Sequence, residues 1–514
     1  MRKCICLLLV LFVSQILAWQ GEHKKAKREL SAGNFSVAEA IYREILSSEP
    51  GDVDALTGLS YVLIKRRNFV EAYETALKVL EKDPLNARAN ALVATALLRS
   101  GHFGFAYQYL QVALSQPKRD ALALASAAEI DLYENRTSEA YDKLRLATYF
   151  EPEEADFWLL YARAASRLDY YRDAAEALER FLRYSPKTDK DRRERIEGVI
   201  KFYKHLGNSN IYKISGKAAV VAFNLKGRRP HLEVKVNNRT GVRFVIDTGA
   251  GVTVISETAA KRLGVREVAR GGNAYAVGGT GSFPIVYGVI DELVIGEVRI
   301  RTVPVYIRQI YTSATSPEDT VDGYIGVAVL SNFLTTIDYL ENKLVIEKRD
   351  SKNALTAADD DSVMPFRLTE SGLISVEVRL EDEASCNFLL DSGASSSVIS
   401  EEVINKQNWH DKVLVNESIK IVGAAGISEN VKIAFLKKLQ LADLVRERIR
   451  MPVLALSMLN EGAGFEQQGI LGGDFLTNCR LRIDFDSLRI FIKIAPNRAL
   501  KRVSVADNAR EGDF

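Results

Sequence analysis

The chain has 514 residues, which is enough for about three domains of roughly 150 residues with buried cores. Hydrophobic residues make up 47% and charged residues 26%, values that are ordinary for globular domains and exclude a largely disordered chain. The net charge is only +2 and no extended basic tract occurs, so we expect no nucleic-acid partner.

The N-terminal segment 1–18 begins with basic side chains, continues with an apolar run from Cys4 to Val13 and ends at the small residue Ala18. This order is typical of a secretory signal peptide, so residues 1–18 predict a secreted, periplasmic or otherwise extracytoplasmic protein. Ile16 occupies a position before the expected cut where a small residue is usual. An uncleaved membrane anchor or a buried helix therefore stays open, although a spanning helix needs ~20 apolar residues. Membrane contact is expected only through this segment.

Outside that segment only two cysteines remain, Cys386 and Cys479. One disulfide between them and two buried thiols are both compatible with the sequence. The five histidines are scattered without the spacing of metal ligands, and no Cys-x-x-Cys motif occurs. We therefore expect no metal site, and no cofactor is predicted.

Residues 22–186 repeat with a constant period of about 34 residues. Turn-type residues recur at this step before an aromatic or similar side chain, and an alanine follows each at one phase: Ala38, Ala72, Ala106, Ala140 and Ala174. A small alanine lets two helices approach closely, and the prolines near the repeat ends, such as Pro84, stop one helix before the next. The pattern resembles the tetratricopeptide repeat, which implies an all-α solenoid with a concave face.

We expect that concave face to bind a partner protein or a peptide, while a spacer or a brace for the following domains is the alternative. Residues 187–210 are predicted to form a capping helix or linker. The pattern then changes near residue 220 to short runs of alternating polar and apolar residues, the period of half-buried strands.

The remaining sequence contains two similar β-rich segments, residues 220–350 and 363–495, with a polar linker at 351–362 and a tail at 496–514. The stretch 243–256 aligns with 387–400, and each contains an Asp-Thr/Ser-Gly triplet after an apolar run. Both copies continue with a glycine-rich turn and then with an apolar-Gly element, which ends at Gly326 in the first copy and at Gly472 in the second. Duplication is the simplest account of elements that recur in the same order at closely matched spacing.

These elements resemble the retropepsin-like and pepsin-like aspartic proteases, which implies two all-β barrel lobes. By that resemblance the catalytic pair is Asp247 and Asp391. The supporting loop residues are Thr248, Gly249, Ser392 and Gly393, the flap residues are Tyr275, Gly278, Gly279, Gly281, Gly423 and Gly426, and the apolar-Gly elements are Ile325, Gly326, Leu471 and Gly472. The first lobe departs from the family after Gly326, where Val-Ala-Val-Leu replaces the Gly-Asp-Phe-Leu of the second lobe.

Two neighbouring carboxyl groups suit the hydrolysis of an amide by water. Like charges ~3 Å apart cannot both ionise, so the pair shares one proton, and one carboxylate accepts a proton from water while the other donates one. The fold class predicted is therefore an all-α repeat solenoid followed by two retropepsin-like lobes, and the function predicted is an aspartic endopeptidase whose repeats recruit a protein or peptide substrate.

Two questions stay open at this stage. The two lobes of one chain can pair as an internal pseudo-dimer, which the short linker favours, or each lobe can pair with its copy in a second chain. The alternative function is a scaffold or peptide-binding protein with inactive protease-like lobes, and hydrolysis of a non-protein amide is a third possibility.

Overall fold

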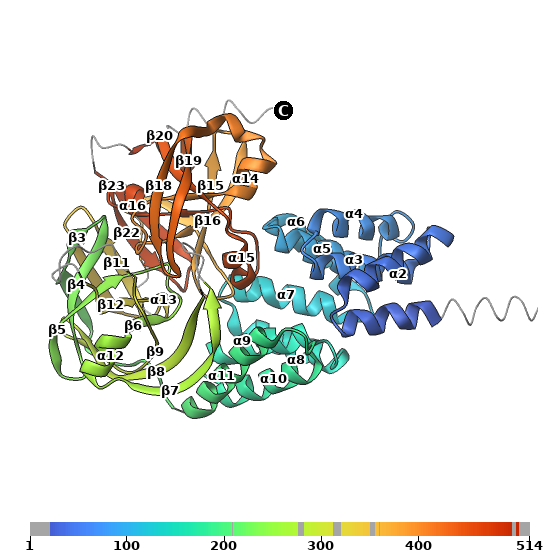
Figure 1. The fold of residues 1–514 in the computed structure, drawn as a ribbon, viewed down its shortest axis with the longest axis horizontal. Coiled ribbons are helices and arrows are strands. Elements are labelled where there is room, and N and C mark those ends of the chain that lie inside the picture. Colours follow the sequence, from blue (N-terminus) through green and yellow to red (C-terminus); the bar gives the residue numbers. More distant parts are fainter. Residues whose placement is uncertain are drawn as a thin grey trace, which may run out of the picture. The chain divides into compact units, whose positions relative to one another are not determined.

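The computed structural model describes residues 21–207, 209–275, 282–311, 320–349, 355–358, 360–495 and 500–502. The chain forms two compact units, a helical unit that ends near Ile196 and a β unit that begins near Glu197 (Figure 1). In the described part of the chain, we find no helix with the length and apolar character needed to cross a membrane.

The helical part of the chain consists of antiparallel helices that follow a first helix over residues 21–31, and its last helix continues past Ile196 into the β unit. They are α2 (Phe35–Ser48), α3 (Val53–Lys65), α4 (Phe69–Leu80), α5 (Ala87–Arg99), α6 (Phe103–Ser115), α7 (Ala121–Tyr133), α8 (Thr137–Phe150), α9 (Ala155–Arg167), α10 (Tyr171–Tyr184) and α11 (Lys190–Leu206). The even-numbered helices from α2 to α10 begin at the constant step of the sequence repeat. All five alanines of the repeat are completely buried, as close helix packing requires. The predicted all-α repeat array is confirmed.

The turn inside each helix pair explains why the period is so regular. Gly33, Arg67, Gly101, Asn135 and Asp169 occupy the same position in successive repeats and all have positive φ, between 57° and 83°. This left-handed conformation is favoured by glycine and tolerated by asparagine and aspartate, so four of these five turn residues fit it. The repeat therefore fixes a backbone conformation as well as a pattern of buried side chains.

The first lobe of the β unit contains most of the strands expected from the alternating pattern. Its elements are β1 (Lys213–Ser215), β2 (Ala218–Ala222), β3 (Asn224–Lys226), β4 (Arg229–Val236), β5 (Arg239–Ile246), β6 (Thr253–Ser256), α12 (Glu257–Leu263), β7 (Arg266–Tyr275), β8 (Ser282–Ile295), β9 (Val298–Arg308), β10 (Gly323–Ile325), α13 (Val327–Leu330), β11 (Phe333–Asp338) and β12 (Lys343–Lys348). Strands β1 and β2 begin before residue 220, where we expected the lobe to start. Strand β10 lies between β5 and β6 in the main sheet.

The second lobe repeats this order. Its elements are β13 (Ser362–Pro365), β14 (Arg367–Leu368), β15 (Ile374–Leu380), β16 (Ala384–Leu390), β17 (Val398–Ser400), α14 (Glu401–Lys406), β18 (Val413–Gly423), β19 (Gly426–Leu441), β20 (Leu444–Leu454), α15 (Ser457–Ala463), β21 (Gly469–Leu471), α16 (Gly473–Leu476), β22 (Cys479–Asp484), β23 (Arg489–Ile494) and β24 (Leu500–Arg502). Strand β21 lies between β16 and β17, as β10 does in the first lobe. Strand β24 pairs with β20, so the segment expected to be only a tail contributes a short strand.

The two lobes share one sheet with the order β13-β23-β22-β11-β12-β2. Its central pair joins β11 of the first lobe to β22 of the second, in antiparallel register from Thr335 with Ile483 to Asp338 with Arg480. Residues of both lobes also belong to one continuous apolar core. The predicted two-lobed β architecture is confirmed, and backbone hydrogen bonds join its halves.

Candidate active site

Asp247 and Asp391 each follow the last residue of a buried strand. Strand β5 ends at Ile246 and β16 ends at Leu390, and both of these side chains are completely buried. The amide of Asp247 donates to the carbonyl of Ile325 at 3.0 Å, and the amide of Asp391 donates to the carbonyl of Leu471 at 2.9 Å. Each aspartate is thereby fixed at the end of a strand while the residue remains partly exposed.

A glycine in each loop makes room for the aspartate of the other lobe. A Cβ atom placed on Gly249 would lie 2.3 Å from Cγ of Asp391, and one placed on Gly393 would lie 2.5 Å from Cγ of Asp247. Each glycine amide also donates to the carboxylate of its own loop, at 2.9 Å for Asp247 and 2.8 Å for Asp391. The structure therefore brings together the aspartates and the loop glycines that the sequence predicted.

The two hydroxyl residues connect the loops reciprocally. Oγ1 of Thr248 donates to the carbonyl of Leu390 at 2.6 Å and accepts from the amide of Ser392 at 2.9 Å. Oγ of Ser392 donates to the carbonyl of Ile246 at 2.7 Å and accepts from the amide of Thr248 at 3.0 Å. Both hydroxyl residues are completely buried, so these four bonds hold the loops in one relative position.

The apolar-Gly elements lie against the same loops. Strand β10 pairs in parallel with β5, which places Ile325 opposite Ile246, and β21 pairs in the same way with β16. A Cβ atom on Gly326 would lie 2.6 Å from the carbonyl oxygen of Ala250, and one on Gly472 would lie 2.5 Å from the backbone of Ser396. These two positions accept only glycine because the backbone of the aspartate loop occupies the space.

The environment of the pair raises the pKa of both carboxyl groups. Burial, followed by the negative charge of Asp391, raises the pKa of Asp247 well above its usual range. Burial also raises the pKa of Asp391, and the two carboxyl groups are in hydrogen-bonding contact. Two acids so close together hold one proton more readily than two isolated ones, and their titration belongs to the pair. The arrangement can offer a proton donor and a proton acceptor to the same substrate.

The flap residues are only partly described. Gly278, Gly279 and Gly281 lie outside the described residues, and Tyr275 is placed by its backbone pairing with Ser282 at the end of the β7–β8 hairpin. In the second lobe Gly423 pairs with Gly426 across a two-residue turn between β18 and β19. The carbonyl of Ala424, in that turn, accepts a hydrogen bond of 2.8 Å from Nη1 of Arg308. The second flap tip therefore reaches the first lobe.

Three residues near the dyad were not found by sequence reasoning: Arg229, Arg308 and Tyr324. The charge of Arg308 acts on Asp247 and that of Arg229 acts on Asp391, in each case lowering the carboxyl pKa against the larger effect of burial. In the strand sequence, Arg308 looks like its exposed neighbours Arg299 and Arg301. Alignment of the duplicated lobes does not single it out, because Arg299 and Arg301 also face other residue types, Val445 and Glu447, at the equivalent positions.

The two cysteines in the described part of the chain are free thiols in the second lobe. Cys386 and Cys479 are buried, and burial raises the pKa of each thiol to about 12. The described ranges also contain no cluster of three His, Cys, Asp or Glu side chains that could hold a metal ion.

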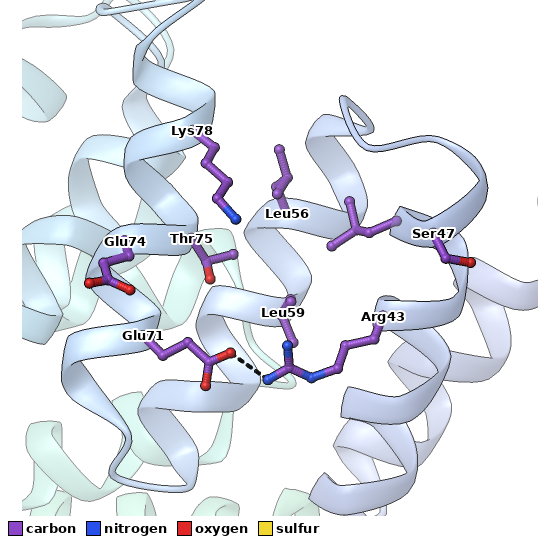
Figure 2. Close-up of a pocket in the computed structure, with 9 residues that line it drawn as sticks. Arg43, Ser47, Leu56, Leu59, Glu71, Glu74, Thr75 and Lys78 are labelled. Carbon is purple, nitrogen blue, oxygen red and sulfur yellow. Dashed lines mark hydrogen bonds and ion pairs between the residues drawn. The ribbon is translucent and has the colours of Figure 1, made fainter.

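The helical unit has a cavity of about 400 Å³ between α2, α3 and α4 (Figure 2). Leu56 and Leu59 supply apolar surface, and Glu74 and Lys78 are charged groups at its border. The full lining is Arg43, Leu46, Ser47, Leu56, Leu59, Glu71, Glu74, Thr75 and Lys78. This mixture of apolar and charged groups suits a peptide better than a uniformly charged ligand.

Ion pairs also join the first helix of one helix pair to residues at the start of the first helix of another pair. Nζ of Lys65 on α3 lies 3.0 Å from Glu154 and 2.7 Å from Asp156, at the start of α9. Arg88 on α5 similarly contacts Asp120 at 2.7 Å. Several charges of the first helices are therefore already neutralised within the unit.

Family models match both parts of the chain. The aspartyl protease model matches residues 232–329 and 376–475, and the tetratricopeptide repeat model matches residues 29–96. The chain combines tetratricopeptide repeats with two tandem aspartyl protease-like lobes. A sequence search among curated proteins found no match to the chain.

Solved structures are similar to each of these two parts. An aspartic proteinase from Irpex lacteus shares 13% identity with a TM-score of 0.35, covering 54% of this chain and 98% of that one. A thermophilic tetratricopeptide repeat protein from Thermus thermophilus shares 18% identity with a TM-score of 0.30, covering 35% and 98%. The pilF protein of Pseudomonas aeruginosa shares 18% identity with a TM-score of 0.28, covering 37% and 86%.

Proposed function

We propose that the chain is an aspartic endopeptidase in which Asp247 and Asp391 of one molecule form a single catalytic dyad. The observation that carries this proposal is the reciprocal fit of the two loops, in which each glycine makes room for the carboxylate of the other lobe. The shared β11–β22 pairing supports the intramolecular arrangement, because it keeps both loops in one molecule at any protein concentration.

In the proposed reaction the dyad starts with one proton and one negative charge. The ionised carboxylate accepts a proton from water as the water oxygen bonds to the peptide carbonyl carbon, and the protonated carboxyl donates its proton to the carbonyl oxygen. The resulting tetrahedral diol then collapses. A proton passes from the dyad to the leaving nitrogen and the C–N bond breaks. One hydroxyl of the diol gives its proton to the dyad as its oxygen becomes the carbonyl oxygen of the new carboxyl group, so the dyad again holds a single proton.

The test is cleavage of an unfolded protein by the full chain and by the variants Asp247→Asn and Asp391→Asn. Each variant should lose about 10²–10⁴-fold in rate, because each removes half of the acid-base pair. Specific activity of the wild type should stay constant on dilution, whereas a dyad built from two chains would lose activity. Full activity in either variant would contradict the proposal, and an inactive wild type would favour a peptide-binding scaffold.

We also propose that the repeats recruit the protein substrate or a partner that presents it. The cavity between α2, α3 and α4 supports a peptide ligand, since apolar and charged groups line it together. The double charge reversal Glu74→Lys with Lys78→Glu should raise KM for a protein substrate relative to KM for a short peptide. An unchanged ratio of the two KM values would argue against recruitment at this cavity.

The proposed location is extracytoplasmic, on the basis of the basic and apolar pattern of residues 1–18. Fractionation of cells that express the full chain tests it, and N-terminal sequencing of the product distinguishes a cleaved signal from a retained anchor.

A further inference from the structure

Equivalent strands pair in the same register within each lobe, so positions around the dyad can be compared between the lobes. In the first lobe Ser256 pairs in parallel with Arg308, at the end of β9. In the second lobe Ser400 pairs in parallel with Leu454, at the end of β20. A buried cation on one side of the dyad therefore corresponds to an aliphatic side chain on the other.

The same comparison holds at two further positions. Tyr324 in β10 corresponds to Ile470 in β21, because each pairs with the equivalent valine of its lobe. Leu232 of β4 pairs with Phe244, as Val376 of β15 pairs with Phe388 in the second lobe. Arg229, three residues before Leu232, therefore corresponds to Leu373. In all three cases the residue from the first lobe is the more polar one, so the two lobes contribute different chemistry to the surroundings of the dyad.

Arg308 is held in a defined position. It is only 9% exposed, its guanidinium lies 4.8 Å from the ring centre of Phe283, and it donates to the flap carbonyl of Ala424 at 2.8 Å. Among the described residues, the carboxylate whose charge acts on it is Asp247, and the two form no ion pair. Its strongest contact is thus to a neutral carbonyl group.

Arg229 lies near the other aspartate and is partly exposed. Its Nε atom is buried and has no hydrogen-bond partner among the described residues. Its charge acts on Asp391 and on the hydroxyl of Tyr324. Withdrawal of a guanidinium from water is costly unless an anion compensates it. This cost is larger for Arg308, which is buried, than for Arg229, which is partly exposed and contacts the hydroxyl of Tyr324.

The charges around the dyad indicate what is missing. A dyad that shares one proton carries one negative charge, whereas Arg229 and Arg308 carry two positive charges. One positive charge is left for a ligand, and guanidinium groups match carboxylates in shape and hydrogen-bonding geometry.

We propose that Arg308 and Arg229, both from the first lobe, form a subsite for a substrate carboxylate beside the dyad, next to the cleaved bond. This inference rests on the proposed peptidase function. The carboxylate belongs either to an Asp or Glu side chain of the substrate or to its C-terminus. The counterparts of these residues in the second lobe, Leu454, Leu373 and Ile470, are aliphatic, so the positions that they occupy beside the dyad suit an apolar group.

Matched quenched peptides test the proposal with the full chain. In the first pair, one peptide has Glu and the other has Gln at the positions flanking the cleaved bond, and both have an amidated C-terminus. In the second pair neither peptide contains Glu, and one ends in a free carboxylate while the other ends in an amide. Wild type should cleave one acidic member with a kcat/KM at least about tenfold above its neutral partner. A preference within the first pair identifies a side chain, and one within the second pair identifies a terminal carboxylate. Equal rates within both pairs would overturn the proposal.

The variants Arg308→Leu and Arg229→Leu install the residues of the second lobe. In each, the ratio of acidic to neutral kcat/KM should fall toward one, and Arg308→Lys should restore part of it. The ratio is informative even if a variant is less active overall. Arg299→Leu is the matched control, because Arg299 lies on the same strand β9 with an exposed side chain that pairs with Glu292. A ratio that survives both leucine variants would contradict the subsite.

Binding to the Asp247→Asn variant separates this inference from the proposed function. Fluorescence anisotropy should show at least about tenfold tighter binding of the preferred acidic peptide than of its neutral partner, whether or not the wild type cleaves. If the wild type is inactive and this difference is present, the enzyme proposal fails and the subsite stands. If binding is equal, the subsite fails whatever the activity.

Discussion

The two lobes have the same strands and aspartate loops, but the side chains around the dyad differ between them. Both contain an aspartate after a buried strand, a glycine against the opposite carboxyl group and a hydroxyl that binds the opposite loop. They differ at Arg308 and Leu454, among other positions. The shared parts determine how the carboxyl groups meet, whereas the differing parts are free to determine which substrate lies beside them.

The largest expected effect is on the shared glycines. Gly249→Ala and Gly393→Ala would each place a methyl group within 2.5 Å of the opposite carboxyl carbon, so that carboxyl group must move. A displacement of about 1 Å can cost 10²-fold in rate, and we expect at least that loss from both variants. Peptide cleavage measures it. A large loss in only one variant would show that the two loops are less equivalent than their geometry indicates.

The buried hydroxyls should affect stability next most strongly. Thr248→Val and Ser392→Ala each leave a buried amide and a buried carbonyl without a partner, at a cost of about 1–3 kcal/mol per group. Both variants should therefore lose about 2–6 kcal/mol in the free energy of unfolding measured with denaturant. The controls Thr248→Ser and Ser392→Thr exchange the residues of the two lobes and should cost less than about 1 kcal/mol. Equal stability of Thr248→Val and the wild type would contradict a role for these bonds.

The dyad makes stability depend on pH. The pKa of Asp247 is raised in the folded protein, so above the ordinary aspartate pKa the folded state retains a proton that the unfolded state loses. Wild-type stability should consequently decrease as pH rises from ordinary aspartate pKa values, by up to about 1.4 kcal/mol per pH unit.

Asp247→Asn should lack this decrease and be about 1–3 kcal/mol more stable than the wild type near neutral pH, with the difference vanishing at strongly acidic pH. Asp391→Asn should behave alike because the pair titrates together. Thermal unfolding across pH measures both. Asp291→Asn is the control, because the side chain of Asp291 is exposed. If Asp247→Asn or Asp391→Asn were less stable than the wild type at neutral pH, the raised pKa would be contradicted.

The smallest expected effect comes from making the lobes more alike. Tyr339 follows β11 and corresponds to Phe485 after β22, and its buried hydroxyl has no hydrogen-bond partner among the described residues. Tyr339→Phe should be neutral or stabilise the protein by up to about 1 kcal/mol, whereas Phe485→Tyr should destabilise it. Denaturant unfolding of both variants compares them. A loss above about 1 kcal/mol in Tyr339→Phe would reveal a partner for the hydroxyl.

Much of this fold could be predicted from the sequence because its signals repeat. The period of the helical repeat indicated where helices such as α6 begin, at Phe103, since Gly101 in the turn before it suits a left-handed conformation. The duplicated Asp-Thr/Ser-Gly triplets indicated which side chains lie together at Asp247 and Asp391. Both predictions depend on local backbone geometry that the residue types report directly.

The rest depends on contacts that no local pattern specifies. The bond from Arg308 to Ala424 joins residues 116 apart, and the ion pair from Lys65 to Asp156 joins residues 91 apart. Neither arginine nor lysine is distinguished in the sequence from an exposed cation on the same element. Strand β24 was missed because so short a strand, pairing along an edge, shows no usable period.

The central pairing of β11 with β22 has a consequence for each lobe as a separate chain. Isolated, either lobe would expose a strand edge with unsatisfied amides and carbonyls, which is a template for adding another strand. Two copies of one lobe could then satisfy that edge in each other. The same hydrogen bonds that join the halves of this protein would make a solitary half prone to dimerise or aggregate.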